Sequence, residues 1–265
     1  MLILIRGAGD IASGIGWRLR RSGFSVAMTD LEQPTAVRWK AAFCQAMWTG
    51  CCEVEGLAAC RCDSPEQAFG ALAAGKIPVL PDPEGRAVKW LKPDVVVDAV
   101  LAKRNLGTRL TDAPLVIGVG PGFTAGEDCH CVIETMRGHT LGRCIYEGSA
   151  LPNTGIPGNV GGYTVERVLR TPCGGTFEPL RSIGDRVEAG ETVALVEGQP
   201  VVSAITGCLR GILPRGTRVP AAGFKAGDVD ARCVRENCFT ISDKALAIAG
   251  GVLEAVCHWR WGREG

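Results

Sequence analysis

Four residues near the start of the chain have the types and spacing that bind phosphate groups. Gly7, Gly9 and Asp10 directly follow the apolar run Leu2–Ile5, and Asp30 ends a second apolar segment. This order is typical of a βαβ nucleotide-binding unit, in which a strand leads into a glycine turn and a helix opens with its N–H groups toward the ligand. Asp30 stands where an acid usually binds a ribose hydroxyl. Its charge disfavours a 2′-phosphate, so NAD or a pterin phosphate is expected before NADP.

Further candidate ligand residues follow another apolar run, Val95–Val97, which ends at Asp98. Lys103 either binds phosphate or an anionic pterin, or lies in a solvated basic turn. Asn105 and, farther along the chain, Asn153 carry amides that could hydrogen-bond to the amide edge of a pterin. We therefore include these four polar residues in the predicted cofactor site.

A third strand end carries a compact glycine turn. The run Leu115–Val119 is followed by Gly120, Pro121, Gly122 and Phe123. Backbone N–H groups in such a turn suit an anion, although the same residues also serve as a simple chain reversal. The sequence therefore predicts three strand ends that converge on one ligand.

One group of side chains has the types needed for acid–base chemistry: His130, Glu134, Arg137 and His139. On a strand, His130 and Glu134 face the same side because their spacing is even. Arg137 could then hold Glu134 ionised or bind a ligand anion. The alternative is a salt bridge within a turn, with both histidines at the surface.

These residues need a scaffold of strands and helices. Several uniformly apolar runs alternate with helical segments, which predicts a parallel sheet covered on both faces. We expect an α/β fold, with a Rossmann-like cofactor-binding domain over residues 1–150. Within it, apolar spacing predicts a helix from Pro34 to about Met47, and Ser64 is expected to cap another helix.

The second half of the chain differs in character. Residues 151–165 form a Gly/Pro-rich loop, either a plain linker or an ordered ligand-facing loop. Short strand-like runs over 166–235 resemble the barrel-sandwich hybrid fold of biotinyl and lipoyl domains. The stretch 199–204 contains no lysine, so we expect no lipoyl or biotinyl group there.

Residues 236–265 are expected to form a C-terminal helix and tail. Ser242 is a suitable N-cap, and an apolar stripe follows it. Gly250 and Gly251 lie inside this helix and would cost about 1–2 kcal/mol relative to alanine. We therefore expect close backbone packing or a ligand at these two glycines.

Composition excludes several classes of function. The net charge is +1 and aromatic residues make up 6%, which gives little support to nucleic-acid binding. No apolar stretch approaches the roughly 20 residues of a membrane span, and Leu2–Ile5 is too short for a signal peptide, so a cytoplasmic location is expected. The 13 cysteines are then expected to be reduced and mostly structural, with no metal site assigned.

Six stretches together resemble one protein family, the YqeB family of selenium-dependent molybdenum hydroxylase maturation proteins. The chain is also distantly similar to XdhC/CoxI proteins, which prepare molybdenum cofactor. The resemblance spans nearly the whole chain, and its motifs are long and in order. They are Arg6–Ala12, Ala102–Thr108, Gly120–Gly126, Val132–Arg143, Pro152–Gly158 and Thr240–Ala245.

The resemblance implies an accessory factor that binds a phosphorylated cofactor of the molybdopterin type and meets a molybdenum hydroxylase as client. Two alternatives remain open: an NAD-dependent oxidoreductase, or a non-catalytic docking protein. The tyrosines Tyr146 and Tyr163 offer no hydride-transfer pair with lysine, because Arg167 follows Tyr163 at the relevant spacing. Sheets of this kind favour a homodimer. Whether the protein is an enzyme is left open.

Overall fold

The computed structural model describes residues 1–262, and the chain divides into two compact units. Unit 1 comprises Met1–Pro34, Ala42–Asn153 and the chain from Ile241 on. Unit 2 comprises Thr35–Ala41 and Thr154–Thr240. Neither unit is one continuous stretch of the sequence. A short early segment belongs to unit 2, and the C-terminal helix belongs to unit 1.

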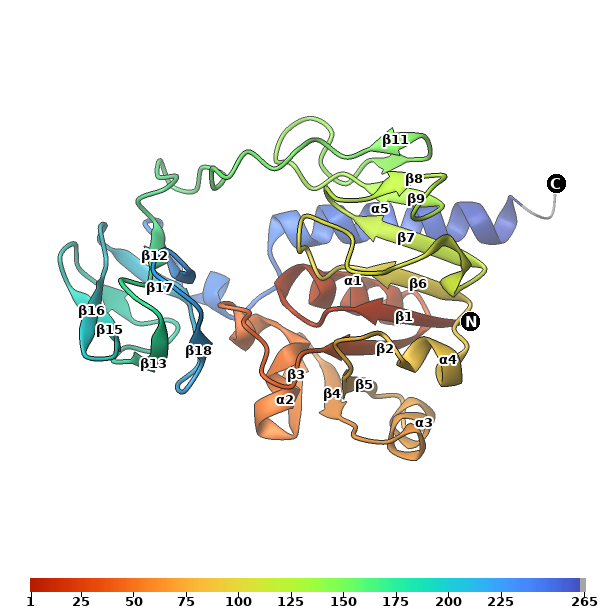
Figure 1. The fold of residues 1–265 in the computed structure, drawn as a ribbon, viewed down its shortest axis with the longest axis horizontal. Coiled ribbons are helices and arrows are strands. Elements are labelled where there is room, and N and C mark those ends of the chain that lie inside the picture. The colour runs from red at the N-terminus through yellow and green to blue at the C-terminus, as the bar shows by residue number, and fades with distance from the viewer. Residues whose placement is uncertain (263–265) are drawn as a thin grey trace. The chain divides into compact units, whose positions relative to one another are not determined.

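Unit 1 is built on a nine-stranded mixed sheet in the order β10-β9-β7-β6-β1-β2-β5-β4-β3 (Figure 1). The edge strands β3 and β10 pair antiparallel, and all other pairs are parallel. A sheet dominated by parallel strands agrees with the predicted α/β class. The strands are β1 (Leu2–Arg6), β2 (Ser25–Asp30), β3 (Cys51–Val54), β4 (Leu57–Arg61), β5 (Ile77–Pro81), β6 (Val95–Asp98), β7 (Leu115–Val119), β9 (Cys131–Ile133) and β10 (Cys144–Ile145).

The strand order reverses beside β1. From β1 the chain adds β2 and β5 on one side, and then returns to place β6, β7 and β9 on the other. In sheets of this kind, ligands bind outside the carboxyl ends of the strands where the order reverses. That point lies between β1 and β6, at Arg6 and Asp98, which are register partners.

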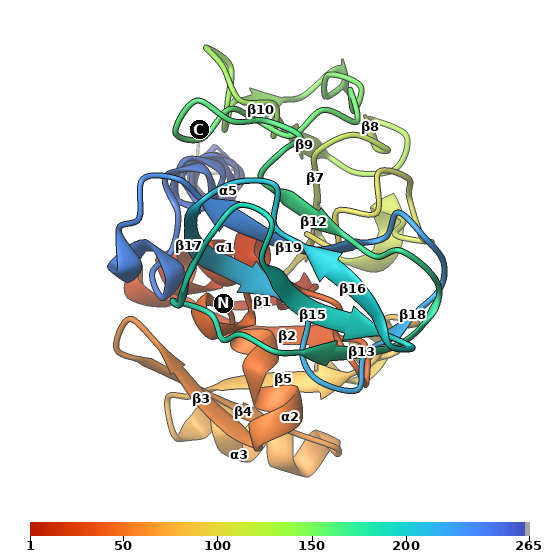
Figure 2. The same ribbon diagram turned by 90° about the vertical axis from the view of Figure 1, so that its left-hand side faces the viewer.

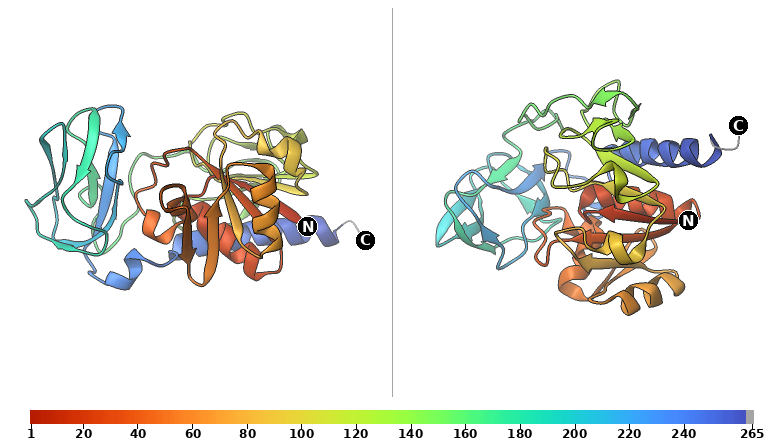
Figure 3. Two further views of the ribbon diagram at one scale, coloured as in Figure 1. Left: turned by 90° about the horizontal axis from the view of Figure 1, so that it is seen from below. Right: turned by 45° about the vertical axis from the view of Figure 1, so that its right-hand side comes forward.

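Helices cover both faces of this sheet. On one face, α1 (Asp10–Arg21) packs beside α5 (Asp243–Trp261), which also contacts β7, β9 and β10 (Figure 3). On the other face, α3 (Pro65–Ala73) and α4 (Ala87–Leu91) pack on a core that includes Leu4, Val96, Val116 and Phe123. A short helix, α2 (Ala46–Thr49), precedes the β3–β4 hairpin, and the pair β8 (Thr124–Ala125) and β11 (Gly148–Ser149) completes the unit.

Unit 2 consists of two four-stranded antiparallel sheets around one core (Figure 2). Val37 and Trp39 of its first segment pack on this core, and Ile212 donates its N–H to the carbonyl of Val37 at 2.9 Å. The first sheet contains β12 (Val168–Arg170), β19 (Lys225–Asp230), β17 (Gly207–Ile212) and β14 (Arg186–Val187). The second contains β16 (Gln199–Val202), β15 (Thr192–Val196), β13 (Gly175–Pro179) and β18 (Arg218–Val219).

The helix predicted from Pro34 to Met47 is wrong. Short 3-10 turns at Trp39–Ala41 and Phe43–Gln45 and the short α2 occupy this region instead. Val37 and Cys44 fit a helical stripe in the sequence, but Val37 packs in the core of unit 2 while Cys44 is buried in unit 1. Two cores therefore use the apolar positions that suggested one helix.

Among residues 1–262, no helix is long and apolar enough to cross a membrane. The longest described helix, α5, instead packs along unit 1. Ser242 caps it by accepting a hydrogen bond from the N–H of Ala245 at 3.2 Å, as the sequence predicts.

The two glycines inside α5 differ in their surroundings. A Cβ at Gly251 would overlap the carbonyl oxygen of Gly142, whereas a Cβ at Gly250 would come no closer than 3.6 Å, to Arg18 Nη1. Close backbone packing, one of the two expectations for this pair, is therefore found at Gly251. Gly142 lies in the connection between β9 and β10, and its N–H donates to the carbonyl of Glu134 at 2.9 Å.

We predict that Gly251→Ala lowers the free energy of unfolding by about 1–3 kcal/mol, because the added methyl overpacks α5 against Gly142. Gly250→Ala is the matched control and should raise it by about 0.5–1 kcal/mol through helix propensity alone. Urea unfolding of both variants measures the difference. Equal changes in the two variants would contradict the close packing.

Candidate functional site

The ends of β1 and β6 lie against each other at the point of reversal. Gly7 has φ +100°, and a Cβ there would come 2.8 Å from the carbonyl oxygen of Ala99. The N–H of Gly7 donates to the carbonyl of Thr29 at 2.8 Å, which fixes the turn to the end of β2. Glycine is therefore required at this position by both conformation and contact.

Asp30 supports the glycine turn from the end of β2. Its Oδ2 accepts a hydrogen bond from the N–H of Ala8 at 2.9 Å, and its Oδ1 accepts one from the N–H of Leu31 at 2.8 Å. Burial raises the pKa of Asp30, and these two backbone hydrogen bonds only partly offset the rise. Gly9 is the N-cap of α1 and Asp10 its first residue, as the sequence predicts.

A buried polar network joins β1 to β6. Arg6 Nη1 donates to the Thr108 hydroxyl and lies 3.5 Å from Asp98 Oδ2, and Thr108 donates to the same oxygen at 2.5 Å. The three residues are 5%, 2% and 2% exposed. Gly85 packs on the guanidinium, because a Cβ there would lie 3.3 Å from Arg6 Cζ. Asp98 is thus committed to an ion pair rather than aimed at a ligand.

The loop after β6 presents the basic residues. Leu101 and Lys103 adopt positive φ angles of 60° and 63°, which are uncommon for residues other than glycine. Gly122 packs against this loop, since a Cβ there would come 2.6 Å from Arg104 Cα. Lys103 and Arg104 are both exposed. The structure therefore brings the loop after β6 and the glycine turn after β7 together.

Several predicted cofactor residues have other contacts. Asn105 donates to Asp128 Oδ1 at 2.9 Å, and its own oxygen accepts from the N–H groups of Gly107 and Thr108. Phe123 is buried, and its ring packs on the backbone of Gly118. Asn105 organises a turn and Phe123 fills the core. Gly120 packs on Thr135, and Asn153 is exposed at the last position of this part of unit 1.

The predicted acid–base residues are not gathered at one place. His130 precedes β9 and accepts the N–H of Val116 at Nδ1, 3.0 Å away, whereas Glu134 follows β9 at its other end. The three residues of β9 lie between them, so four steps along the strand place the two residues about 13 Å apart. Arg137 forms a bidentate pair with Asp243 at 2.8 and 2.9 Å, and His139 is exposed.

Glu134 instead binds backbone groups. It is 2% exposed, and its Oε1 accepts the N–H groups of Thr135 and Met136 at 2.6 and 2.7 Å. Its Oε2 accepts the N–H of Leu151 at 2.8 Å. Three N–H donors on one buried carboxylate hold the segment after β9 to the start of the glycine-rich loop. This arrangement supports a positioning role for Glu134.

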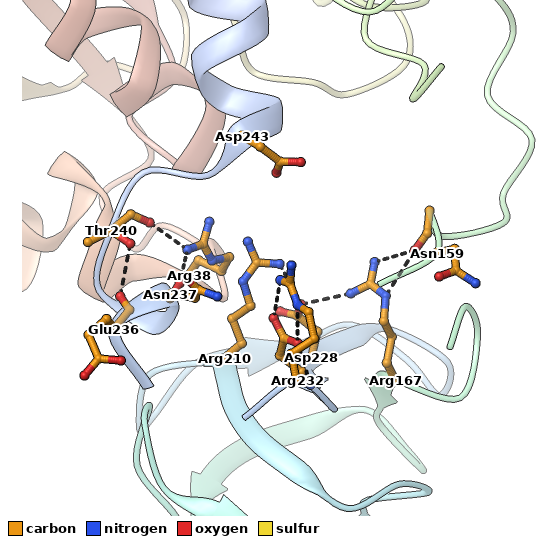
Figure 4. A network of polar contacts seen from close by, with 12 residues as sticks. Arg38, Asn159, Arg167, Arg210, Asp228, Arg232, Glu236, Asn237, Thr240 and Asp243 are labelled. Carbon is orange, nitrogen blue, oxygen red and sulfur yellow. Dashed lines mark hydrogen bonds and ion pairs between the residues drawn. The ribbon is translucent and has the colours of Figure 1, made fainter. Parts of the chain in front are cut away.

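Unit 2 contains a separate network of arginines and aspartates (Figure 4). Arg167 Nη1 lies 3.0 Å from Asp228 Oδ2, and Arg210 Nη1 lies 3.9 Å from the same oxygen. Arg232 makes two hydrogen bonds to Asp230, at 2.9 and 2.6 Å. Burial would raise the pKa of Asp230, but the hydrogen bonds and charge of Arg232 outweigh it and the pKa is lowered.

This arginine network also anchors the Gly/Pro-rich loop. Arg167 donates from Nε and Nη2 to the carbonyl of Gly158, at 3.2 and 3.1 Å. A Cβ at Gly161 would lie 3.2 Å from Arg232 Cγ. Arg38 Nη2 donates to the carbonyls of Asn237 and Thr240 at 2.9 Å each, which ties the first segment of unit 2 to its last (Figure 4).

Two cavities of unit 1 lie away from the predicted site. One of about 480 Å³ is lined by residues of β4, of α3 and of the chain on either side of α3, including Cys60, Cys62 and Lys76. Another of about 290 Å³ is lined by Cys62, Asp82 and Trp90, among others. None of the predicted site residues lines either cavity. Within residues 1–262, no group of three or more histidine, cysteine, aspartate or glutamate side chains is placed to hold a metal ion.

Comparison with known proteins shows one clear relative. The chain is 48% identical over 255 residues to the uncharacterized protein YqeB of Escherichia coli (strain K12). The chain is a homologue of YqeB. The alignment covers 96% of this chain and 47% of YqeB, so the chain spans about half the length of that relative. The predicted resemblance to YqeB is confirmed, whereas the similarity to XdhC/CoxI proteins stays a prediction.

The remaining comparisons add no functional information. No family model matches the chain. A crystal structure of an aspartoacylase family protein from Mesorhizobium loti overlaps 86% of this chain and 83% of its own, with a TM-score of 0.27 and 11% identity. That similarity is too low to support an argument about fold or activity.

Sequence analysis missed Arg6 and Thr108 as partners of Asp98. A signal existed, because Arg6 is a charged residue that ends an apolar run and a buried guanidinium needs a carboxylate. Asp98, which ends another apolar run, was the natural candidate. Thr108 is 10 residues from Asp98, in a loop whose residue types and spacing carry no sign of the contact.

We predict that Asp98→Asn lowers the free energy of unfolding by about 3–5 kcal/mol, because it leaves the Arg6 charge buried without its carboxylate. Asp94→Asn is the control, because Asp94 directly precedes β6 whereas Asp98 ends it. Asp94 is exposed and accepts only the N–H of Leu2 among the hydrogen bonds described, so its loss should cost about 1 kcal/mol. Thermal or urea unfolding measures the loss of stability in each variant. Equal losses in the two variants would contradict a buried ion pair between Arg6 and Asp98.

Proposed function

We propose that this protein binds a phosphorylated cofactor of the molybdopterin type and assists the maturation of selenium-dependent molybdenum hydroxylases. The observation that carries the binding part is the contact between the glycine turn after β1 and the loop after β6, at the reversal of strand order. Gly7 and Ala99 make that contact. The amino end of α1 begins at the same turn, which favours a phosphate group.

The residues at this edge fit a phosphate by their chemistry. Lys103 and Arg104 are exposed cations on a loop whose backbone is fixed by Gly122. Two carboxylates nearby are already engaged, Asp98 with Arg6 and Asp30 with backbone N–H groups. We assign phosphate binding to the amino end of α1 and to Lys103, with Arg104 beside it, because the N–H groups of Gly7 and Ala8 already bond to Thr29 and Asp30.

The finer fold assignments belong to the same proposal. Unit 1 would be a Rossmann-like domain, and unit 2 a domain resembling the barrel-sandwich hybrid fold that lacks the modified lysine. Unit 2 would then meet the client enzyme, and α5 would support the cofactor site within unit 1. The maturation role rests on the resemblance to the YqeB family, and YqeB of Escherichia coli is itself an uncharacterized protein.

The test begins with protein purified without oxygen. Mass spectrometry of small molecules released from it, followed by titration with molybdopterin and with NAD, measures which cofactor binds. A bound pterin is the expected result. NAD binding without pterin would overturn the proposal in favour of an oxidoreductase, and binding of neither would favour a docking protein.

We predict that Lys103→Ala weakens molybdopterin binding about tenfold, since a charge-assisted hydrogen bond contributes about 1.5 kcal/mol. Lys92→Ala is a matched control. Both lysines are exposed and have positive φ, 63° and 46°, so both substitutions meet the same backbone conformation. Lys92 precedes β6 and lies at the opposite end of that strand from Lys103. Equal affinity in the two variants would exclude Lys103 from the site.

A further inference from the structure

Two cysteines at the end of β4 point to the same face of the large sheet. Cys60 is the next-to-last residue of β4, and Cys62 directly follows the strand. The N–H of Cys62 donates to the carbonyl of Val79 at 2.9 Å, which continues the pairing of β4 with β5 beyond the last residue of β4. Side chains alternate along an extended chain, so the two thiols share one face. Both pack on the core beneath α3 and α4.

The two sulfur atoms are close enough to bind one ion together. Cys60 Sγ and Cys62 Sγ are 3.9 Å apart. Bonds between a metal ion and a thiolate sulfur are about 2.3 Å long in zinc sites, so an ion bound to both sulfurs would make an S–metal–S angle of about 116°. That angle lies between the angles of tetrahedral and trigonal sites. A metal ion therefore fits the separation that the structure shows.

The thiol pair borders open space. Cys60 and Cys62 both line the cavity of about 480 Å³, and Cys62 also lines the cavity of about 290 Å³. Gly70, Ala71 and Ala74 line the larger cavity, and their small side chains leave room beside the thiols. Cys62 is 2% exposed and Cys60 is half-buried, so an ion reaches the pair on the side of Cys60.

Another cysteine pair with the same spacing is arranged differently. Cys129 and Cys131 are also two residues apart, but both are buried. Cys129 Sγ donates to the carbonyl of Thr124 at 4.0 Å, and Cys131 Sγ donates to the carbonyl of Val132 at 3.7 Å. Neither cysteine lines the two cavities. Spacing alone therefore does not make such a site, whereas sulfur contact and access distinguish Cys60 and Cys62.

A cation bound by this pair must replace thiol protons. The Cys62 thiol donates to the carbonyl of Cys60 at 3.7 Å. Burial raises the pKa of Cys62 to about 12, and the neighbouring Cys60 adds to the rise, so Cys62 carries its proton at neutral pH. A metal ion takes the place of the proton on each sulfur that it binds, and its positive charge offsets the two adjacent thiolates.

We propose that Cys60 and Cys62 form a binding site for a soft monovalent metal ion, copper(I). Thiolate ligands suit copper(I) and zinc(II). Structural zinc sites take four protein ligands, but the described part of the chain places no set of three or more histidine, cysteine, aspartate or glutamate side chains around one ion. Copper(I) is stable with two or three sulfur ligands, so it fits the pair better. Each sulfur that binds gives up its proton, and copper stays in the +1 state. This inference does not rest on the proposed function.

The experiment uses the reduced full-length protein without oxygen, and it supplies copper(I) as the coloured complex with bathocuproine disulfonate. The unmodified sequence should take one equivalent of copper(I) from this chelator. Cys60→Ser and Cys62→Ser should each weaken this binding at least about tenfold, because even the loss of a residue that only orients a metal ligand costs that much. Cys129→Ser is the matched control and should bind like the unmodified sequence.

A second measurement needs no variant. Alkylation by iodoacetamide, with and without one equivalent of copper(I), is read by mass spectrometry of the peptides. Copper(I) should protect Cys60 from alkylation. Cys173, which is half-buried in unit 2, should react equally under both conditions.

Equal alkylation of Cys60 with and without copper(I) would overturn the proposal, whether or not the serine variants fold. Unchanged affinity in Cys60→Ser would also overturn it, and so would a loss of binding confined to Cys129→Ser. Displacement of copper(I) by an equal concentration of zinc(II) would assign the pair to a four-coordinate ion and reject copper(I).

Discussion

A buried ion pair holds together the two strands between which the sheet reverses its order. Arg6 ends β1 and Asp98 ends β6, and Thr108 hydrogen-bonds to both. Because an unpaired charge at this depth is costly, the three side chains must stay together once the sheet has formed. Their contact sets the distance between the glycine turn after β1 and the loop after β6. Both segments of the proposed phosphate site depend on that distance.

The C-terminal helix completes this sheet. The chain after β7 covers the face formed with α3 and α4, where Phe123, Ala125 and Cys129 pack. On the opposite face, α5 packs beside α1 and covers β7, β9 and β10. Gly14 and Gly251 allow close approaches, to Ala245 and Gly142 respectively. The last element of the sequence therefore supports the strands whose ends carry the candidate site.

Much of unit 1 could be predicted because its signals are local. Uniform apolar runs identified β6 and β7. Ser64 caps α3 by accepting the N–H of Gln67, as predicted. Gly251 packs closely against Gly142, which is one reason for a glycine to stand inside a helix. These features depend on residues that are near in sequence or on one unusual residue type. The parallel sheet followed from them.

The failures share a different physical origin. The segment after Pro34 looked helical because Val37 and Cys44 have helical spacing, but each is buried in a different core. Spacing placed Glu134 beside His130, but they lie at opposite ends of β9, and Glu134 accepts three N–H groups, one of them from Leu151; its catalytic role stays a prediction. Such roles are set by contacts between residues distant in sequence, and no periodicity records them. The contact of Thr108 with Asp98 spans only 10 residues, but it is made by a loop without periodicity.

Hydrogen exchange measured with and without saturating molybdopterin tests the central claim most directly, because it reports the site at peptide resolution in the full-length protein. The account predicts slowed exchange at the glycine turn after β1, in the loop that contains Lys103 and at the turn before Phe123. Unchanged exchange in these three segments, or slowing confined to the cavities beside β4 and α3, would contradict it.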